Sequence, residues 1–600
     1  MFIRIKSTPN SPRRSVQVVE SVRTGTKVSQ KIVRYMGIAM DDQEAAQLRH
    51  MGEEFIERES LARLNGQSLF DVPNLPKPGR PARQTLESVL PPSEVALSDV
   101  VEETRRVEGP HEVLGHLYDY LRFNKILGDR TRGAGLLRDL VIARVMAPDS
   151  KRASVHNLQE NYGKEHSLDA LYRLMDQVEA NLDRLKQQVY QATASLLDRT
   201  VDILLFDVTT LYFESVQIDE DETDEQGEVT LGLRKFGYSK DQKFHMTQVV
   251  IALATTAEGL PIGYELFPGN TAEVKTLIAC INNWRTTLKI DKVSFVADRA
   301  LCSEANLTVL AQQSWNYVVA MPMRKSLTGS EQARLLESRI AKAMQIDGDL
   351  MWVRETTWKG RRLIATYSAK RAYKDAADRQ AILDKLQKKL QQAKSAKSAK
   401  PTKTKPTPTG PDAAQVDAVP ATETKAGNAK KLISNSGYMK YTTQTDTGGV
   451  FEINTEKVAA DAAWDGMHAI VTNDWETPAD ILLARYRRLW MIEDSFRLIK
   501  HNLAVRPIYH FKHERIKAHI GICYLAFALM RHAQVRIKLA QQPMSVEDIK
   551  RTLHGVQSSI LVHRTTKARY RLPGKFTHDA AKIYRAFGIT RNLDAAVLLD

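Results

Sequence analysis

The chain has 600 residues, which is enough for roughly two to four domains, and its 43% hydrophobic and 26% charged residues are typical of globular proteins. Lysine and arginine outnumber aspartate and glutamate, 86 against 71. The resulting charge of +15 favours nucleic acid over a membrane surface as partner. Three isolated cysteines exclude a disulfide framework and a cysteine zinc site, and they indicate a reducing cytosol. We expect no secretory signal and no membrane-spanning segment.

The N-terminal region, 1–95, is predicted to be a basic β-hairpin followed by a linker. Residues 1–37 alternate apolar and polar side chains around Thr24-Gly25-Thr26, and they contain eight lysines and arginines but one acid. This hairpin either lies on a phosphate backbone or forms a charged, solvent-facing edge. The proline-rich stretch 72–95 is typical of a linker. The helical periodicity that follows predicts an all-α domain over 96–200, a candidate DNA-binding domain.

The segment 201–324 alternates buried strands with helical patterns. We predict strands at 201–215, 244–256 and 260–270, a helix at 273–288, and strands at 292–300 and 316–322. A β-meander followed by an α-crossover to parallel strands is the order of the ribonuclease H-like core. The fold class is therefore predicted to be α/β, with 201–324 as the first part of a ribonuclease H-like catalytic core.

The core is predicted to be interrupted by a β-rich insertion over 325–474. Within it, residues of about 390–430 are rich in lysine, alanine, proline and threonine, which is typical of a disordered linker. The segment 475–600 is predicted to complete the core with a helix that carries Glu493 and with basic C-terminal helices.

The stretch 486–500, YRRLWMIEDSFRLIK, is predicted to be one amphipathic helix. Tyr486, Glu493 and Lys500 recur every seven residues and share one face beside an apolar stripe that includes Leu489. Helix-stabilising ion pairs favour spacings of three or four residues, so they do not explain this pattern. We predict that Glu493 lies at the lip of the surface on which the helix packs.

Two aspartates of the predicted core each terminate a hydrophobic strand. Asp207 lies on the first strand and Asp298 on the fourth, and these strands are neighbours in the predicted order. For either aspartate alone, a strand-end cap or a turn residue is the better interpretation. Together with Glu493, they offer the oxygen ligands that Mg²⁺ prefers. Two such ions would activate a nucleophile and stabilise the leaving oxygen in phosphoryl transfer on DNA.

Three sequence stretches carry a family resemblance: DVTTLYFE around Asp207, VADRALCSEAN around Asp298, and YRRLWMIEDSFRLIK around Glu493. The chain resembles the DDE transposases of bacterial insertion sequences, in the cut-and-paste group with the signature Y-x2-R-x3-E-x6-K. The resemblance runs over most of the chain. Leu489 occupies the arginine position of the signature, so that role is not transferred, and the adjacent Arg488 is kept as a candidate DNA contact.

The resemblance implies a DNA transposase that cleaves insertion-sequence ends in a Mg²⁺-dependent reaction and transfers the 3′-hydroxyl into target DNA. It implies that Asp207, Asp298 and Glu493 bind two Mg²⁺ ions, with Mn²⁺ as a substitute. It also implies double-stranded DNA as the partner, a homodimer in the DNA complex, and a bacterial cytoplasmic location with nucleoid association on DNA. The implied and candidate DNA contacts are Tyr486, Arg488, Lys500, Arg299, Asn270 and Thr271.

Several interpretations stay open at this point. Asn270 and Thr271 either contact DNA or form only a turn, and Arg299 pairs with either a phosphate or a surface acid. A structure-selective nuclease of the same fold would cut DNA without joining it. An inactive transposase-derived DNA-binding protein would keep the fold but lose a carboxylate, and the presence of all three acids argues against it.

Overall fold

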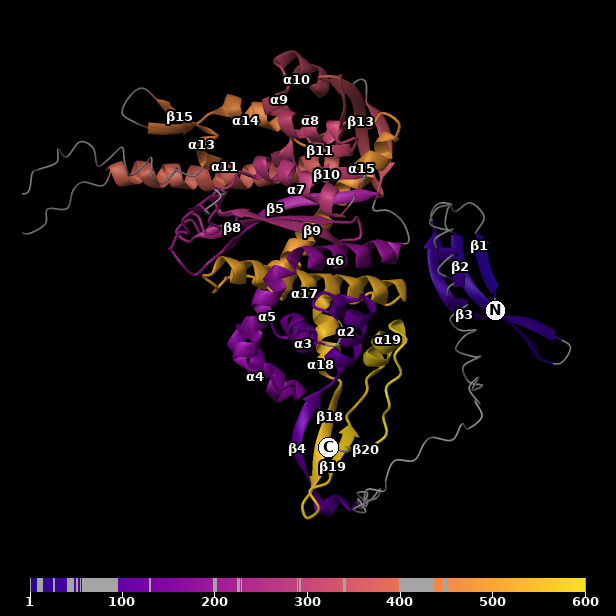
Figure 1. Cartoon of the computed structure of the whole chain (residues 1–600). Helices are drawn as coiled ribbons and strands as arrows, with labels where there is room; N and C mark the ends of the chain where they lie inside the picture. The colour runs from indigo at the N-terminus through magenta and orange to yellow at the C-terminus, as the bar shows by residue number, and fades with distance from the viewer. Residues whose placement is uncertain are drawn as a thin grey trace, which may run out of the picture.

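The computed structural model describes residues 2–7, 14–24, 27–39, a few residues between 48 and 56, and 95–598, with gaps at 129–130, 198–201, 224–226, 228, 289, 291–292, 338–340, 399–435 and 446–449. At the N-terminus, β1 (Phe2–Ser7), β2 (Arg14–Thr24) and β3 (Lys27–Ala39) form an antiparallel sheet (Figure 1). The predicted hairpin is confirmed as β2 and β3. The predicted linker lies outside the described residues up to position 94.

The region 96–200 is helical with one exception. The elements are η1 (Leu97–Asp99), β4 (Val100–Val107), α2 (Gly109–Tyr120), η2 (Phe123–Lys125), α3 (Arg132–Met146), α4 (Lys151–Tyr162), α5 (Leu168–Ala180) and α6 (Leu182–Leu197). The all-α prediction is wrong for β4. This strand pairs with a segment more than four hundred residues away in the sequence, and a local pattern cannot indicate such a partner.

A large mixed sheet forms the centre of the molecule. Its strands are β5 (Ile203–Tyr212), β8 (Gln248–Thr255), β9 (Pro261–Pro268), β10 (Ser294–Ala297), β11 (Asn316–Ala320), β12 (Lys342–Ile346), β13 (Asp349–Trp358), β14 (Arg361–Tyr367) and β17 (Met467–Thr472). Their order across the sheet is β12-β13-β14-β17-β11-β10-β5-β8-β9. The protein is therefore a mixed α/β protein. A two-residue hairpin, β6 (Glu222–Thr223) with β7 (Val229–Thr230), lies between β5 and β8 in the sequence.

The strands from β5 to β11 follow the predicted succession. β5, β8 and β9 form an antiparallel meander, and β10 and β11 then run parallel to β5. The crossovers contain α7 (Glu273–Leu288) and α8 (Glu304–Gln312), of which α8 was not predicted. β8 is buried along its whole length because both faces of the sheet are covered.

Each face of the sheet has its own apolar core. Phe206 and Phe295 point to the face covered by α7 and α8, where they pack around Trp284. Leu205 and Val296 point to the opposite face, which is covered by α6 and by helices from the C-terminal part of the chain. Alternation along β5 therefore assigns Asp207 to the second face.

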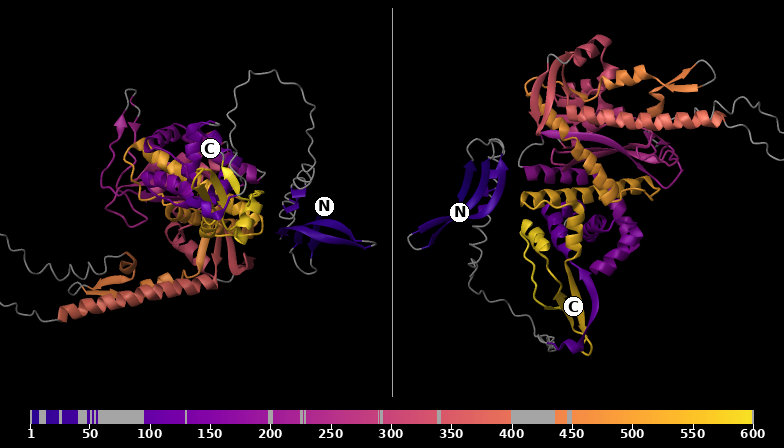
Figure 2. Two further views of the ribbon diagram at one scale, coloured as in Figure 1. Left: turned by 90° about the horizontal axis from the view of Figure 1, so that it is seen from below. Right: turned by 180° about the vertical axis from the view of Figure 1, so that it is seen from behind.

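The predicted insertion extends the main sheet. β12, β13, β14 and β17 continue it beyond β11. The other elements of this part are α9 (Met323–Ser326), α10 (Gly329–Leu336), α11 (Ala369–Ser398), α13 (Ser436–Met439), β15 (Thr442–Thr445), β16 (Val450–Ile453) and α14 (Thr455–Ala462). The helix α11 runs outward from the sheet (Figure 2). Most of the predicted disordered linker lies outside the described residues.

The elements of the C-terminal part are α15 (Ala479–Arg487), α16 (Trp490–Arg497), the π-helix η5 (Leu498–Asn502), α17 (His513–Leu539), α18 (Val546–His554), β18 (Gln557–His563), β19 (Arg569–Pro573), α19 (His578–Ala586) and β20 (Ala596–Leu598). Of these, α15 lies beside β10 and β11, whereas the elements from α17 onward lie below the sheet and continue away from it (Figure 1). The order β20-β19-β18-β4 defines a four-stranded antiparallel sheet, which was not predicted.

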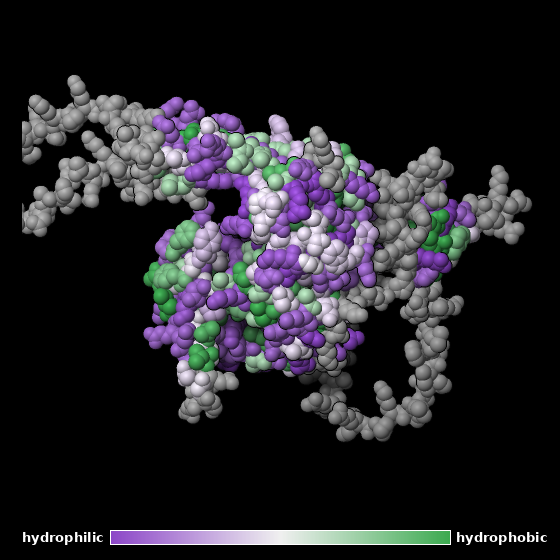
Figure 3. Space-filling view, turned by 90° about the horizontal axis from the view of Figure 1, so that it is seen from above, coloured by the Kyte–Doolittle hydropathy of each residue, from purple (hydrophilic) through white to green (hydrophobic). Residues whose placement is uncertain are grey.

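The helix α17 is buried through its middle, as the apolar sequence there indicates. Within the described part of the chain, no helix is long and apolar enough to span a membrane. The face shown in Figure 3 mixes hydrophilic and hydrophobic residues over the main sheet and its helices.

Candidate active site

Asp207 and Asp298 lie on neighbouring parallel strands. The last paired residues of β5 and β10 are Phe206 and Ala297, and the two aspartates follow directly. Asp298 comes at the end of β10, as expected. The prediction that Asp207 also ends its strand is wrong, because β5 continues to Tyr212 and pairs Asp207 with Leu253 of β8. The two carboxylates therefore come from adjacent positions at one end of β10.

The Asp207 carboxylate is half-buried and carries an unfavourable charge. Its pKa is raised to about 6, chiefly by burial and to a smaller extent by the nearby carboxylates of Asp298 and Glu273. The Lys240 ammonium and a hydrogen bond from the Val208 N–H to Oδ1, at 2.7 Å, oppose this rise. Asp207 thus lies where an added cation would be favourable.

Lys240 is a site residue that sequence reasoning missed. Its Nζ lies 4.0 Å from Oδ1 of Asp207 and 2.8 Å from Oε1 of Glu273, and it donates to the Val208 carbonyl. Burial disfavours the ammonium, but Asp207 and Glu273 outweigh it and raise the pKa of Lys240. The only sequence signal was a short basic segment before β8, which resembles any surface loop.

Asp298 combines a structural and an electrostatic role. Its Oδ1 accepts a hydrogen bond of 2.8 Å from the Ala300 N–H and caps η3 (Arg299–Leu301). The cap interpretation is therefore correct, and the same carboxylate also acts electrostatically on Asp207. Arg299, directly after Asp298, is exposed.

The stretch 486–500 is not one continuous helix. α15 ends at Arg487, Arg488 and Leu489 form a turn, and α16 gives way to η5 at Leu498. The prediction that 486–500 is one amphipathic helix is therefore wrong. α15 packs on β10, β11 and β12, whereas α16 packs on β5 and β8.

Glu493 lies in the first turn of α16 and is exposed. Tyr486 lies in the last turn of α15, with its ring 4.9 Å from that of His468. The pKa of Tyr486 is raised to about 12, chiefly by burial, with contributions from the charges of Asp298 and Glu493. Tyr486 thus lies within electrostatic reach of both carboxylates. Among the described residues, no three acidic, histidine or cysteine side chains come together closely enough to enclose a metal ion.

Lys500 reaches the same face of β5. Its Nζ donates to Oγ1 of Thr209 at 2.7 Å, two residues beyond Asp207, and lies 3.3 Å from Oδ1 of Asp241. Burial lowers the pKa of Lys500, and Asp241 partly offsets this. The prediction placed this lysine along the DNA path, whereas in the structure its ammonium has protein partners.

Leu489, which stands where the family signature has arginine, is buried as expected for an apolar side chain. Leu489 is 8% exposed and belongs to the core cluster under the sheet. Arg488 is exposed beside it, and Arg487 instead lies 2.6 Å from Asp349. An arginine at position 489 would have to leave this core, so Arg488 is the available cation here.

Asn270 and Thr271 lie in the loop between β9 and α7, with Asn270 exposed. The Thr271 N–H donates to the Pro268 carbonyl at 2.9 Å, so a turn is present. A Cβ on Gly269 would lie 2.0 Å from the Gln248 carbonyl oxygen, so only glycine allows this close approach. The loop leads directly to Glu273, which binds Lys240, and this places it beside the carboxylates.

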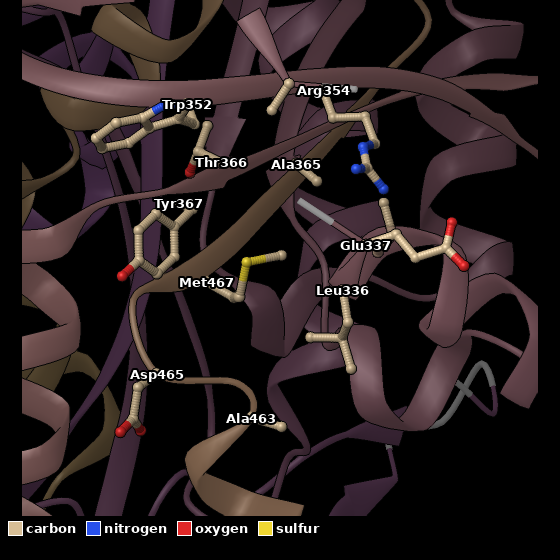
Figure 4. A pocket seen from close by; sticks show the side chains of 12 residues that line it. Leu336, Glu337, Trp352, Arg354, Ala365, Thr366, Tyr367, Ala463, Asp465 and Met467 are labelled. Carbon is tan, nitrogen blue, oxygen red and sulfur yellow. The ribbon is translucent and has the colours of Figure 1, made fainter. Parts of the chain in front are cut away.

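A cavity of about 270 Å³ lies against the extended part of the sheet. Trp352, Tyr367 and Met467 line it together with Arg354 and Asp465 (Figure 4). None of the predicted site residues contributes to it.

The comparisons with known proteins identify the family of this chain. The family model described as "Transposase DDE domain" matches residues 198–529, which include Asp207, Asp298 and Glu493. The match covers more than half of the chain, and the protein belongs to this family of transposases.

Other similarities are weak. A piggyBac transposase synaptic complex with hairpin DNA aligns with 75% of this chain and 77% of that chain, at 9% identity and a TM-score of 0.33. A similarity this low supports no inference about the fold or the site. No curated protein matches the sequence.

Proposed function

We propose that the protein is an insertion-sequence transposase of the cut-and-paste type with a ribonuclease H-like catalytic core. The order β9-β8-β5-β10-β11, with a meander followed by two parallel strands, supports this fold. The reaction is hydrolytic cleavage at the ends of the element, followed by attack of the freed 3′-hydroxyl on target DNA. The single observation that carries the proposal is the juxtaposition of Asp207 and Asp298 on paired parallel strands.

The carboxylates fit a divalent cation. Asp207 and Asp298 offer hard oxygen ligands, and each raises the electrostatic cost of the other's charge. Glu493 would complete the ligand set from α16. Bound Mg²⁺ or Mn²⁺, two ions in the proposed complex, would supply an activated nucleophile and stabilise the leaving oxygen. The protein's own part is to hold the two aspartates in register and to bring Glu493 to them from the helix.

The DNA contacts are proposed from their positions around the carboxylates. Arg299 and Arg488 are exposed cations, and Asn270 is exposed on the adjoining loop with Thr271 beside it. Tyr486 can donate its hydroxyl to a phosphate near Asp298. Lys500 would reach a phosphate by exchanging Asp241 for it. Each contact would position the backbone of the DNA end without specifying its sequence.

The remaining regions complete the proposal. The basic sheet within 1–95 and the helices of 96–200 would hold the DNA ends, 201–324 and 475–600 would form the catalytic core, and 325–474 the insertion. We place the protein in the bacterial cytoplasm, where its three free cysteines would remain reduced. Two protomers would bridge two ends in the DNA complex.

The test replaces Glu493 by alanine in the full chain and uses DNA that contains the element's ends. We expect DNA binding to survive and Mg²⁺-dependent cleavage to vanish, because the third oxygen ligand is lost. Glu476→Ala, at another exposed acid of the same part of the chain, is the matched control and should cleave normally. Persistent cleavage by Glu493→Ala would contradict the assignment.

A second assay separates the transposase from a nuclease of the same fold. Precleaved ends with a free 3′-hydroxyl are mixed with target DNA, and joined products are measured. A transposase joins the ends to the target, whereas a structure-selective nuclease produces no joined DNA.

A further inference from the structure

The loop before β8 brings a lysine into the candidate active site in a fixed position. The Lys240 N–H donates to Oγ1 of Thr210 at 3.2 Å, and Ser239 is 2% exposed. Asp241, on the other side, lies 3.1 Å from Nη1 of Arg506 and 3.3 Å from Nζ of Lys500. Ser239 and Asp241, the two neighbours of Lys240, are thus held in place. This fixes the direction in which the Lys240 side chain leaves the backbone.

Lys240 supplies a positive charge among the carboxylates of the candidate site. Three carboxylates, of Asp207, Asp298 and Glu273, act on one another electrostatically. The Lys240 ammonium lies between two of them, at 4.0 Å from Asp207 and 2.8 Å from Glu273. The Val208 carbonyl accepts a further hydrogen bond from it. A cation is therefore already present beside the first metal-ligand candidate.

We propose that Lys240, held by Glu273, is an internal counter-cation that stabilises the metal-free carboxylates and competes electrostatically with the divalent ion. This inference rests on the proposed function, because it requires a metal at Asp207 and Asp298. It differs from a phosphate-binding role, since its effect is present without DNA. It also differs from a purely structural role, which would not strengthen metal binding when it is lost.

Two opposite consequences follow from removing the charge. Without Lys240, the carboxylates repel one another with less compensation, so the metal-free protein unfolds more easily. The same loss removes a positive charge close to the incoming cation, so the cation binds more tightly. A single substitution should therefore lower the stability of the metal-free chain and raise its affinity for metal.

The experiment measures Mn²⁺ binding to the full chain without DNA, by the paramagnetic signal of free Mn²⁺, together with thermal unfolding in chelator. For Lys240→Met we expect about threefold to tenfold tighter Mn²⁺ binding and a lower midpoint of unfolding. Lys240→Arg keeps the charge and should bind Mn²⁺ as the natural chain does. Lys275→Ala removes an exposed cation of α7 and is the matched control, with no change in either quantity.

The outcomes separate this inference from the function on which it rests. Asp298→Asn is expected to abolish the Mn²⁺ binding of the natural chain. If Mn²⁺ binding does not depend on Asp298, the proposed metal site and the role of Lys240 both fail. If binding depends on Asp298 but is unchanged or weaker in Lys240→Met, the role of Lys240 alone is overturned. Lys240→Gln serves the same test if the methionine variant does not fold.

Discussion

Two aspartates of this protein show how the same side chain is used for different ends. Asp207, in the main sheet, and Asp461, in α14, are 22% and 10% exposed, so both are largely removed from water. Burial raises the pKa of each carboxyl group, yet the net effects have opposite sign. The pKa of Asp207 rises to about 6, whereas that of Asp461 falls below its usual value.

The neighbours explain the difference. Asp461 accepts hydrogen bonds from Lys440 at 2.6 Å, from the Tyr441 hydroxyl and from Arg324, and these overcome the cost of burial. Asp207 has other carboxylates nearby and one lysine at 4.0 Å. A buried carboxylate with its donors supplied by the protein fixes structure. Asp207 accepts from the Val208 N–H but has fewer donors than Asp461, so it is suited to a cation from outside. This deficit distinguishes the candidate site more clearly than burial does.

The largest expected effect comes from Asp207→Asn. We expect single-turnover cleavage of DNA ends to fall about a thousandfold or more, because a proposed metal ligand worth several kcal/mol in the transition state is lost. The free energy of unfolding at pH 7 should change by less than about 1 kcal/mol, because the charge that is removed was poorly compensated. Denaturant unfolding measures the second quantity. A loss of stability that matches the loss of cleavage would contradict the comparison.

Asp461→Asn should show the reverse. The substitution leaves Lys440 and Arg324 without their shared carboxylate, and we expect a loss of about 1–3 kcal/mol, reduced because both cations are partly exposed. Cleavage per folded molecule should match that of the natural chain. Denaturant unfolding and end cleavage on the same preparations check this. A Mg²⁺-dependent defect in the folded variant would show that Asp461 belongs to the site.

The sequence predicted the central strands because their apolar runs are long and bounded. The run before Asp207 and the run before Asp298 are buried strands, and a crossover through α7 makes them parallel neighbours. The same information could not place β4 against β18, since strand pairing across more than four hundred residues has no local signal. Local periodicity predicts where helices and strands form, whereas tertiary packing determines which of them lie next to one another.

The same distinction applies to the candidate site, where the sequence predicts some residues and only the fold reveals others. Asp207, Asp298 and Glu493 follow from position and family signature. The break after Arg487 does not, because the apolar spacing continues across it while the two helices pack on different strands. Lys240 and Asp241 were missed because their loop has no periodicity. Their importance arises only when the fold brings the loop to Asp207 and Lys500.

The pH dependence of stability provides a smaller and sharper test. Asp207 has a raised folded pKa, so the folded state holds its proton between the ordinary pKa near 4 and about 6. Stability from this group therefore falls as pH rises through that window. Between pH 4.5 and 7.5, the difference in unfolding free energy between the natural chain and Asp207→Asn should fall by about 1–2 kcal/mol. The corresponding difference for Asp461→Asn should stay flat, because a carboxyl with a lowered pKa is ionised throughout in both states.

The smallest expected effect concerns two lysines beside these aspartates. Lys440 is 50% exposed and lies beside Asp461, whereas Lys240 is 33% exposed and lies beside Asp207 and Glu273. Lys440→Met should cost less than about 1 kcal/mol in unfolding free energy, since water screens this pair and Tyr441 and Arg324 still bind Asp461. It should leave Mn²⁺ affinity unchanged, whereas Lys240→Met should strengthen it. Because the two substitutions remove the same charge at similar exposure, an equal response of Mn²⁺ affinity to both would mean that overall charge, and not position beside Asp207, controls metal binding.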